Sequence, residues 1–338
     1  MDNVRAADGW PSVLMYTPVH LLWDGQAAVY IFFVLSGFVV ALPVIRRRAN
    51  FSWLTYYPQR LARLYLPVWA AVAFTVGLIL FIDRNTPIGN SWLDASAGFV
   101  SKRDLFLDLT LIVGDGELMS QLWTLRWEVI FSILLPLYVW IAIRFNRHWL
   151  AIATASLGLI VAGQFGLGSY ASILPMFMLG VLLAVRLPEV SEFSARLNRG
   201  QRAWIVAGTL LLMSSPWMLT GLGATGSLVG VSRVAAIVAA TVSVWIALTV
   251  PAASRVLSSR GMQWLGTISF SLYLVHEPIV ISSAFFFGED QLVIAAVVAI
   301  TLSLGVAVAF YHLIERPSHL FARWLGQAVQ EKFGSKVA

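Results

Sequence analysis

Long apolar runs, each close to the length that crosses a bilayer, recur along the whole chain. A transmembrane helix needs about 20 largely apolar residues. Nine segments meet this requirement: residues 26–45, 65–82, 121–143, 149–166, 170–187, 203–221, 229–250, 263–287 and 291–313. Proline interrupts several of them, as at Pro136 and Pro278, which a helix bundle tolerates because neighbouring groups bond the freed backbone. The pattern predicts an all-α, polytopic membrane helix bundle with about nine transmembrane helices.

Basic residues gather at alternate ends of these predicted spans. Arg46, Arg47 and Arg48 follow the first run, Arg60 and Arg63 precede the second, and further arginines and lysines follow the third, fifth, seventh and ninth. If the spans alternate in direction, all of these cations share one side, which the positive-inside rule makes cytoplasmic. The 83–120 loop, rich in Asp, falls on the other side. Residues 1–25 are then an outer segment and residues 318–338 a cytoplasmic tail.

Composition narrows the class of protein. Of the 338 residues, 59% are hydrophobic and 12% are charged, whereas a soluble domain has roughly 25% charged residues. A soluble enzyme, a disordered chain and a fibrous protein are therefore excluded. No linker divides the chain, so we expect one integral-membrane domain over residues 1–338. The net charge of +6 reflects cytoplasmic loops rather than a nucleic-acid partner.

Several kinds of site have no support in the sequence. The chain contains no cysteine, which removes disulfides, thiolate metal sites and cysteine nucleophiles. It also has no nucleotide-binding loop and no His-rich or Cys-rich metal spacing. We therefore predict neither a metal site nor nucleotide hydrolysis.

Ionisable residues inside the predicted spans are the first candidates for chemistry, because charge within a bilayer is costly. Arg126 and Glu128 are two positions apart, so on a helix they point roughly 200° from each other and each needs a separate partner. Glu128 belongs either to a structural ion pair between helices or to a functional cavity. His276 is either a structural residue or a proton-transfer group. Pro278 frees a backbone carbonyl one turn earlier, which is available either to bond a neighbouring helix or to line a cavity.

Two further short motifs have a physical interpretation. Arg60 and Arg63, at i and i+3, share a helix face at the cytoplasmic interface and suit either a phosphate or anionic lipid headgroups. Ser36-Gly37, within an apolar run, is consistent with close approach of a second helix or with a bend of the backbone.

The same segments resemble, in order, the motifs of the membrane acyltransferase-3 family. The matching strings are YIFFVLSGFVV, RLARLYLPVW, LWTLRWEVIFSILLP, LGTISFSLYLVHEPI and YHLIERP. Thr124 and Ser132 stand where the family pattern has Ser and Tyr. Each string alone is a weak apolar signal, but the ordered set over residues 23–317 is specific.

The resemblance implies an activity and a set of partners. Members O-acylate surface and exported glycans and some small molecules. This implies transfer of an acyl group, with acetyl expected, from cytoplasmic acyl-CoA to a hydroxyl of an extracytoplasmic glycan or glycolipid. Arg60 and Arg63, supported by Arg46, Arg47 and Arg48, would hold the CoA phosphates. Glu128 and His276 would line the transfer cavity, with His276 as the acid/base. The implied location is a bacterial inner membrane, in contact with lipid.

The family pattern has ten helices, and the first carries an Arg and, about ten residues later, a catalytic His. Nothing before Phe32 matches this helix, and His20 falls in what resembles the first outer loop. We therefore expect that the sequence begins one helix late, or that this copy has lost its activity. A non-enzymatic membrane component, or a transporter of lipid-linked glycan, is the alternative from another class.

Overall fold

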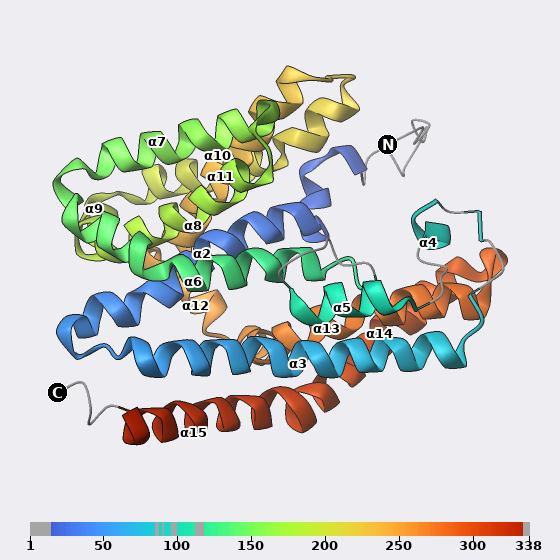
Figure 1. Ribbon diagram of the computed structural model, residues 1–338. Helices are drawn as coiled ribbons and strands as arrows, with labels where there is room; N and C mark the ends of the chain where they lie inside the picture. Colours follow the sequence, from blue (N-terminus) through green and yellow to red (C-terminus); the bar gives the residue numbers. More distant parts are fainter. Residues whose placement is uncertain (1–14, 85–87, 90, 96–99, 112–117, 334–338) are drawn as a thin grey trace. The chain divides into compact units, whose positions relative to one another are not determined.

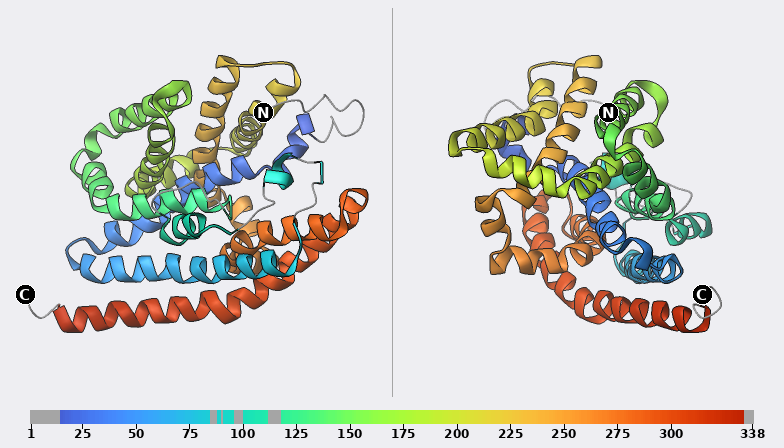
Figure 2. Two further views of the ribbon diagram at one scale, coloured as in Figure 1. Left: turned by 45° about the vertical axis from the view of Figure 1, so that its right-hand side comes forward. Right: turned by 90° about the vertical axis from the view of Figure 1, so that its left-hand side faces the viewer.

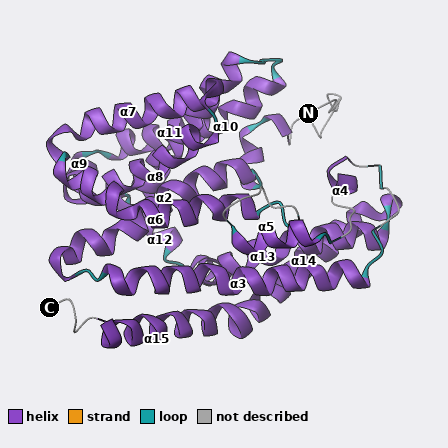
Figure 3. Ribbon diagram, in the orientation of Figure 1, coloured by secondary structure: helices purple, strands orange, loops and turns teal. Residues whose placement is uncertain are grey.

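The computed structural model describes residues 15–84, 88–89, 91–95, 100–111 and 118–333 (Figure 1). Within these ranges the chain forms helices and connecting turns, with no β-strand (Figure 3). Eight helices are long and apolar enough to cross a membrane, and a ninth span results if the bent pair of helices between residues 169 and 196 is counted as one. The predicted all-α membrane bundle is confirmed.

Each predicted span corresponds to a helix. These helices are α2 (Gly25–Arg47), α3 (Trp53–Phe81), α6 (Leu122–Arg144), α7 (Trp149–Ala162), α8 (Ser169–Val185), α10 (Arg199–Gly221), α11 (Ser227–Thr249), α13 (Arg260–Phe287) and α14 (Leu292–Phe310). The shorter or more polar helices are α4 (Ser91–Ala95), α5 (Lys102–Thr110), α9 (Leu187–Arg196), α12 (Pro251–Leu257) and α15 (Arg316–Phe333). Single turns and short 3-10 or π segments connect them, including η1 (Pro18–Leu22) and the π-helical η6 (Tyr311–Glu315).

Two helices extend beyond what hydropathy predicts. Helix α3 begins at Trp53 rather than at residue 65. Ser52 is its N-cap residue and accepts a hydrogen bond from the Thr55 N–H through its side chain. The first turns of α3 contain arginines and tyrosines, so their hydropathy does not predict a membrane span. The predicted tail from residue 318 belongs largely to helix α15. Small buried residues four positions apart, Ser318, Ala322 and Gly326, form the inner face of α15.

The helices divide into two compact units. Unit 1 comprises Met1–Phe51 and Leu134–Ser258, and unit 2 comprises Ser52–Ile133 and Ser259–Ala338. Helix α6 is shared, its first half belonging to unit 2 and its second half to unit 1. The prediction of one integral-membrane domain stays a prediction.

In unit 1, helices α2 and α8 cross with their backbones in close approach. A Cβ atom at Gly180 would overlap the carbonyl group of Val34, and one at Gly37 would overlap that of Phe177. The rings of Phe33 and Phe177 pack beside this crossing, with centroids 5.1 Å apart. Small residues at such a crossing let two membrane helices approach closely. The close approach predicted at Ser36-Gly37 is therefore present.

In unit 2, α3, α13, α14 and the first half of α6 surround the core, and α15 lies along α3 (Figure 2). Part of the predicted outer loop, 83–120, joins this core. Leu111 and Met119 are buried in it, and buried Asp108 accepts hydrogen bonds from the N–H groups of Leu118 and Met119. The side chains of Tyr65 and Trp69 on α3 bond to carbonyls at the end of α5. The apolar residues around Asp108 explain why this stretch packs inside the unit.

Candidate functional site

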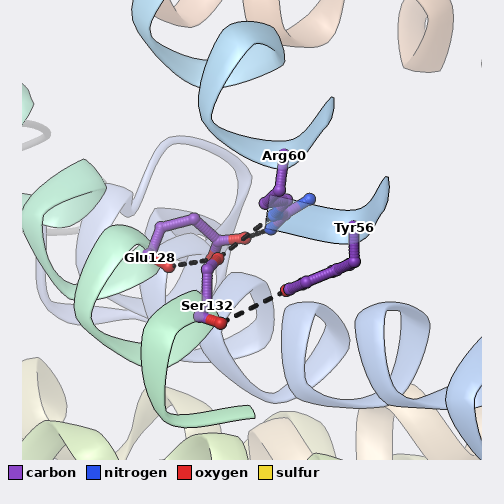
Figure 4. Close-up of polar contacts among 4 residues, drawn as sticks. All are labelled: Tyr56, Arg60, Glu128 and Ser132. Carbon is purple, nitrogen blue, oxygen red and sulfur yellow. Dashed lines mark hydrogen bonds and ion pairs between the residues drawn. The ribbon is translucent and has the colours of Figure 1, made fainter. Parts of the chain in front are cut away.

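The first element of the candidate site is an ion pair between two helices of unit 2. Arg60 of α3 bonds to the carboxylate of Glu128 on α6 (Figure 4). Glu128 is only 3% exposed, and the Arg60 side chain is 18% exposed. The guanidinium of Arg126 lies over the ring of Trp127, with its Cζ 5.3 Å from the centroid. Glu128 therefore takes part in an ion pair between helices, and a separate partner for Arg126 stays a prediction.

Ser132 completes the surroundings of Arg60. The Arg60 Nε donates to Ser132 Oγ (3.1 Å), and Ser132 Oγ donates to the main-chain carbonyl of Glu128 (2.6 Å). The Tyr56 hydroxyl, one turn before Arg60, donates to the Ser132 carbonyl (3.5 Å) (Figure 4). A buried ion pair needs such additional bonds, because its mutual attraction alone rarely offsets desolvation. The guanidinium is thus held in one position by α6.

A buried polar row continues along the same face of α6. Gln121, Thr124, Glu128 and Ser132 are each no more than 7% exposed. Their spacing of three, four and four residues keeps them on one side of a helix. This spacing was visible in the sequence as a polar stripe in an apolar run. It would have identified Gln121, which the motif comparison did not single out, and would have given Ser132 a role beyond its departure from the family pattern.

At the other end of this row, Glu277 of α13 caps the start of α6. Its carboxylate accepts a hydrogen bond from Ser120 Oγ (2.5 Å) and one from the Gln121 N–H (3.0 Å). Glu277 is 5% exposed. A carboxylate is favoured at a helix N-terminus because the unpaired N–H groups there carry partial positive charge. The negative charge of Glu277 is therefore stabilised inside the bundle by the beginning of another helix.

The carbonyl group freed by Pro278 also has a partner on α6. Proline at 278 has no N–H to offer the carbonyl of Leu274, and the side-chain amide of Gln121 donates to that carbonyl instead (3.3 Å). The Tyr273 hydroxyl donates to the main-chain carbonyl of Gln121 and lies 2.5 Å from Thr124 Oγ1. Of the two alternatives for the freed carbonyl, the structure shows the bond to a neighbouring helical segment.

His276 lies beside this network. Its Nδ1 is 3.1 Å from the Leu272 carbonyl oxygen and 2.9 Å from that of Tyr273. Carbonyl oxygens only accept hydrogen bonds, so these contacts assign the hydrogen to Nδ1 and leave the lone pair of the neutral imidazole on Nε2. The rings of Tyr273 and His276 are 6.0 Å apart between centroids. His276 is thereby connected through Tyr273 to Thr124, one turn before Glu128.

Arg63 faces a different neighbour from Arg60. Its electrostatic partners are Glu315 in η6 and Arg323 on α15. Buried Glu315 accepts a short hydrogen bond from Ser271 Oγ (2.5 Å) and lies 3.9 Å from His319 Nε2. Residues three apart on a helix differ by roughly 60° in direction, which is enough to turn Arg60 to α6 and Arg63 to α15. Arg60 and Arg63 therefore interact with different helices, although the sequence predicts that they share one helix face.

The remaining candidates lie elsewhere. Arg46 and Arg47 end α2 and Arg48 follows it, all in unit 1, so their support of Arg60 and Arg63 stays a prediction. His20 is also in unit 1, where its ring stacks on Trp217 at 4.9 Å between centroids. Over the described part of the chain, no three His, Asp or Glu side chains are grouped to hold a metal ion.

Comparison with known families supports one assignment. The model of a family described as an acyltransferase domain, that of the acyltransferase-3 proteins, matches residues 7–312. The match covers α2 to α14 and therefore includes Arg60, Glu128 and His276. No curated protein and no solved structure matches the chain.

Proposed function

The chain belongs to the acyltransferase-3 family, and from this premise we propose that it transfers an acyl group from acyl-CoA to a hydroxyl of a glycan or glycolipid. Acetyl is the expected group. The donor binds from the cytoplasm and the acceptor from the outer side of a bacterial inner membrane. The clustering of Arg and Lys at alternate span ends supports this orientation, with the C-terminus in the cytoplasm.

The reaction requires a base and a proton donor. The acceptor hydroxyl oxygen forms a bond to the thioester carbonyl carbon, the carbon–sulfur bond breaks, and the hydroxyl proton passes through the base to the CoA sulfur. A positioned base contributes typically 10²–10⁴-fold to such a rate. We assign this role to His276, because its Nδ1 faces two carbonyls and its Nε2 is then able to accept a proton. This observation is the main support for the proposal.

Glu128 and Arg60 have a positioning role in this proposal. A carboxylate paired with a guanidinium is stabilised in its charged form and is a poorer base than a neutral imidazole. The contact with Arg60 therefore favours Glu128 as the residue that orients this guanidinium beside the transfer cavity. Arg63, which is exposed on α3, is the better-placed of the two arginines to contact a CoA phosphate. Arg46, Arg47 and Arg48 are proposed to add positive charge on the cytoplasmic side.

Transfer of radiolabelled acetyl groups from acetyl-CoA, in vesicles containing the full chain, tests the role of His276. His276→Gln should lower the rate by about 10²–10⁴-fold without changing CoA affinity. His312→Gln removes an exposed imidazole in η6 and is the matched control. Equal rates for wild type and His276→Gln would exclude His276 as the base. A wild-type protein that neither binds acyl-CoA nor transfers acetyl would favour the non-enzymatic alternative.

Arg63→Ala tests the donor site separately. Hydrogen bonds to charged groups contribute about 1.5–3 kcal/mol each, so the loss of CoA affinity should be at least about tenfold. The measurement is equilibrium binding of CoA to purified protein. An unchanged affinity would leave Arg63 with a role in lipid contact only.

A further inference from the structure

The helix that follows the matched family region is held on α3 in a fixed register. The side-chain oxygen of Gln330 accepts hydrogen bonds from Ser52 Oγ (2.7 Å) and Thr55 Oγ1 (2.9 Å). One turn further along α3, Gln59 packs against Gly326, where a Cβ atom would overlap its side chain. Each step of four residues forward on α3 is thus a step of four backward on α15, as in two antiparallel helices.

This register places Arg63 level with Ala322 of α15. One turn of helix is about four residues. Arg63 lies one turn after Gln59 on α3, and Ala322 lies one turn before Gly326 on α15, so the two face each other as Gln59 and Gly326 do. Ala322 is fully buried, and its small side chain leaves room for the neighbouring positions to reach Arg63. Those positions are His319 and Arg323, and both interact electrostatically with Arg63. The packing of the two helices therefore brings two guanidinium groups and one imidazole within electrostatic range of one another.

The charges at this point are unbalanced. Arg63 and Arg323 repel each other, and Glu315 is the carboxylate that acts on Arg63. The Glu315 carboxylate is also bonded to Ser271 Oγ, and it is buried at the base of the cluster, whereas Arg63 and Arg323 are exposed. Two exposed guanidiniums at the rim and one buried carboxylate beneath them leave a net positive site. An anion bound at the rim would remove the repulsion.

We propose that Arg63 of α3 and Arg323 of α15 together bind one phosphate group of the acyl-CoA donor. Each guanidinium offers a planar fork of N–H groups that matches two phosphate oxygens. Two guanidiniums from different helices surround a phosphate more completely than Arg60 and Arg63, which belong to the same helix. Arg60 is moreover already bonded to Glu128. The assignment rests on the proposed acyl-CoA donor. It adds Arg323, which lies beyond the matched residues 7–312.

Arg323→Gln tests this site in the full chain, reconstituted in nanodiscs of zwitterionic phosphatidylcholine. CoA affinity should fall at least about tenfold, the loss expected from one charged contact. Lys332→Gln removes an exposed cation from the same helix and should leave the affinity unchanged. Arg323→Lys keeps the charge but loses the fork, so its affinity should fall between those of wild type and Arg323→Gln. An affinity of Arg323→Gln equal to that of Lys332→Gln overturns the proposal.

A second arm distinguishes the donor phosphate from a lipid phosphate, since both share the same chemistry. In nanodiscs containing phosphatidylglycerol, native mass spectrometry counts the bound anionic lipids. Loss of a bound lipid in Arg323→Gln, with CoA affinity unchanged, would assign the site to a headgroup and overturn the donor assignment. Failure of the wild-type protein to bind CoA would reject the proposed function itself. If Arg323→Gln does not fold, Arg323→Lys alone decides, because a wild-type affinity in that variant contradicts a bidentate contact.

Discussion

The side-chain amide of Gln121 donates a hydrogen bond to the carbonyl of Leu274, the same carbonyl that Pro278 leaves without its helical donor. A helix break in α13 and the start of α6 are therefore parts of one contact. The adjoining carboxylate of Glu277 bonds to the Gln121 N–H. At this contact α13 has a carbonyl without a helical donor and α6 begins with N–H groups without helical acceptors, and each helix supplies what the other lacks.

This contact predicts a coupled effect of two substitutions. Gln121→Leu removes the donor and leaves a buried carbonyl unsatisfied, which should lower the free energy of unfolding by about 1–3 kcal/mol. Pro278→Ala restores a main-chain donor for the Leu274 carbonyl. In the double variant the cost of Gln121→Leu should therefore be smaller, as measured by unfolding in detergent. Costs that simply add would show that the two residues do not share this carbonyl.

The ion pair of Arg60 and Glu128 predicts a strong asymmetry between single and double substitutions. Glu128→Leu leaves the partly buried Arg60 without its counter-charge and should destabilise the protein, by up to about 3–5 kcal/mol. Arg60→Met combined with Glu128→Leu removes both charges and should be closer to wild type. The yield of folded protein and its unfolding temperature in detergent compare the variants. A double variant no more stable than Glu128→Leu would contradict the pairing.

The close crossing of α2 and α8 predicts that Gly180 cannot gain a side chain. Gly180→Ala places a methyl group against the Val34 carbonyl, and such overpacking costs about 1–3 kcal/mol. Gly208→Ala is a suitable control, because a Cβ atom on Gly208 of α10 has nothing within 4 Å. Thermal unfolding should separate the two, with Gly208→Ala at or above wild-type stability. Equal stability of both variants would show that the crossing is looser than the structure has it.

The distribution of cations predicts the orientation of the chain. A reporter fused after Arg202 or Arg260 should read as cytoplasmic, and one fused near Gly98 as external. Gly98 itself lies outside the described residues. Helix α5, which follows Gly98 in the chain, bonds to Tyr65 and Trp69 of α3 through its last carbonyls. A cytoplasmic reading near Gly98 would overturn the assignment of the spans.

Local physical rules predicted much of this structure. Apolar run length identified the membrane helices, because the bilayer imposes one length on all of them. Helical geometry alone indicated that Glu128 would need a partner other than Arg126, and the missing N–H of Pro278 indicated a contact on a neighbouring helix. Each of these depends only on residues within a few positions of one another.

The partners themselves were not predictable in this way. Arg60 and Ser132 are 72 residues apart, and Ser271 and Glu315 are 44 apart, so only the packing of helices brings them together. The sequence did not indicate the polar beginning of α3 or the helix α15, because the contacts between them join residues that are far apart in the chain. Gln330 bonds to Ser52 and Thr55, and neither segment is apolar enough to be recognised by hydropathy.

The Glu277 cap also has a consequence for biogenesis. Ser120 and Glu277 are 157 residues apart, and translation proceeds at about 5–20 residues per second. The first turn of α6 is therefore synthesised roughly 8–30 s before Glu277, whose carboxylate accepts the hydrogen bonds at the start of this helix. During that interval its free N–H groups depend on water, lipid headgroups or the insertion machinery. A chain arrested before residue 277 should have its residues 118–124 open to protease, and completion of α13 should close them.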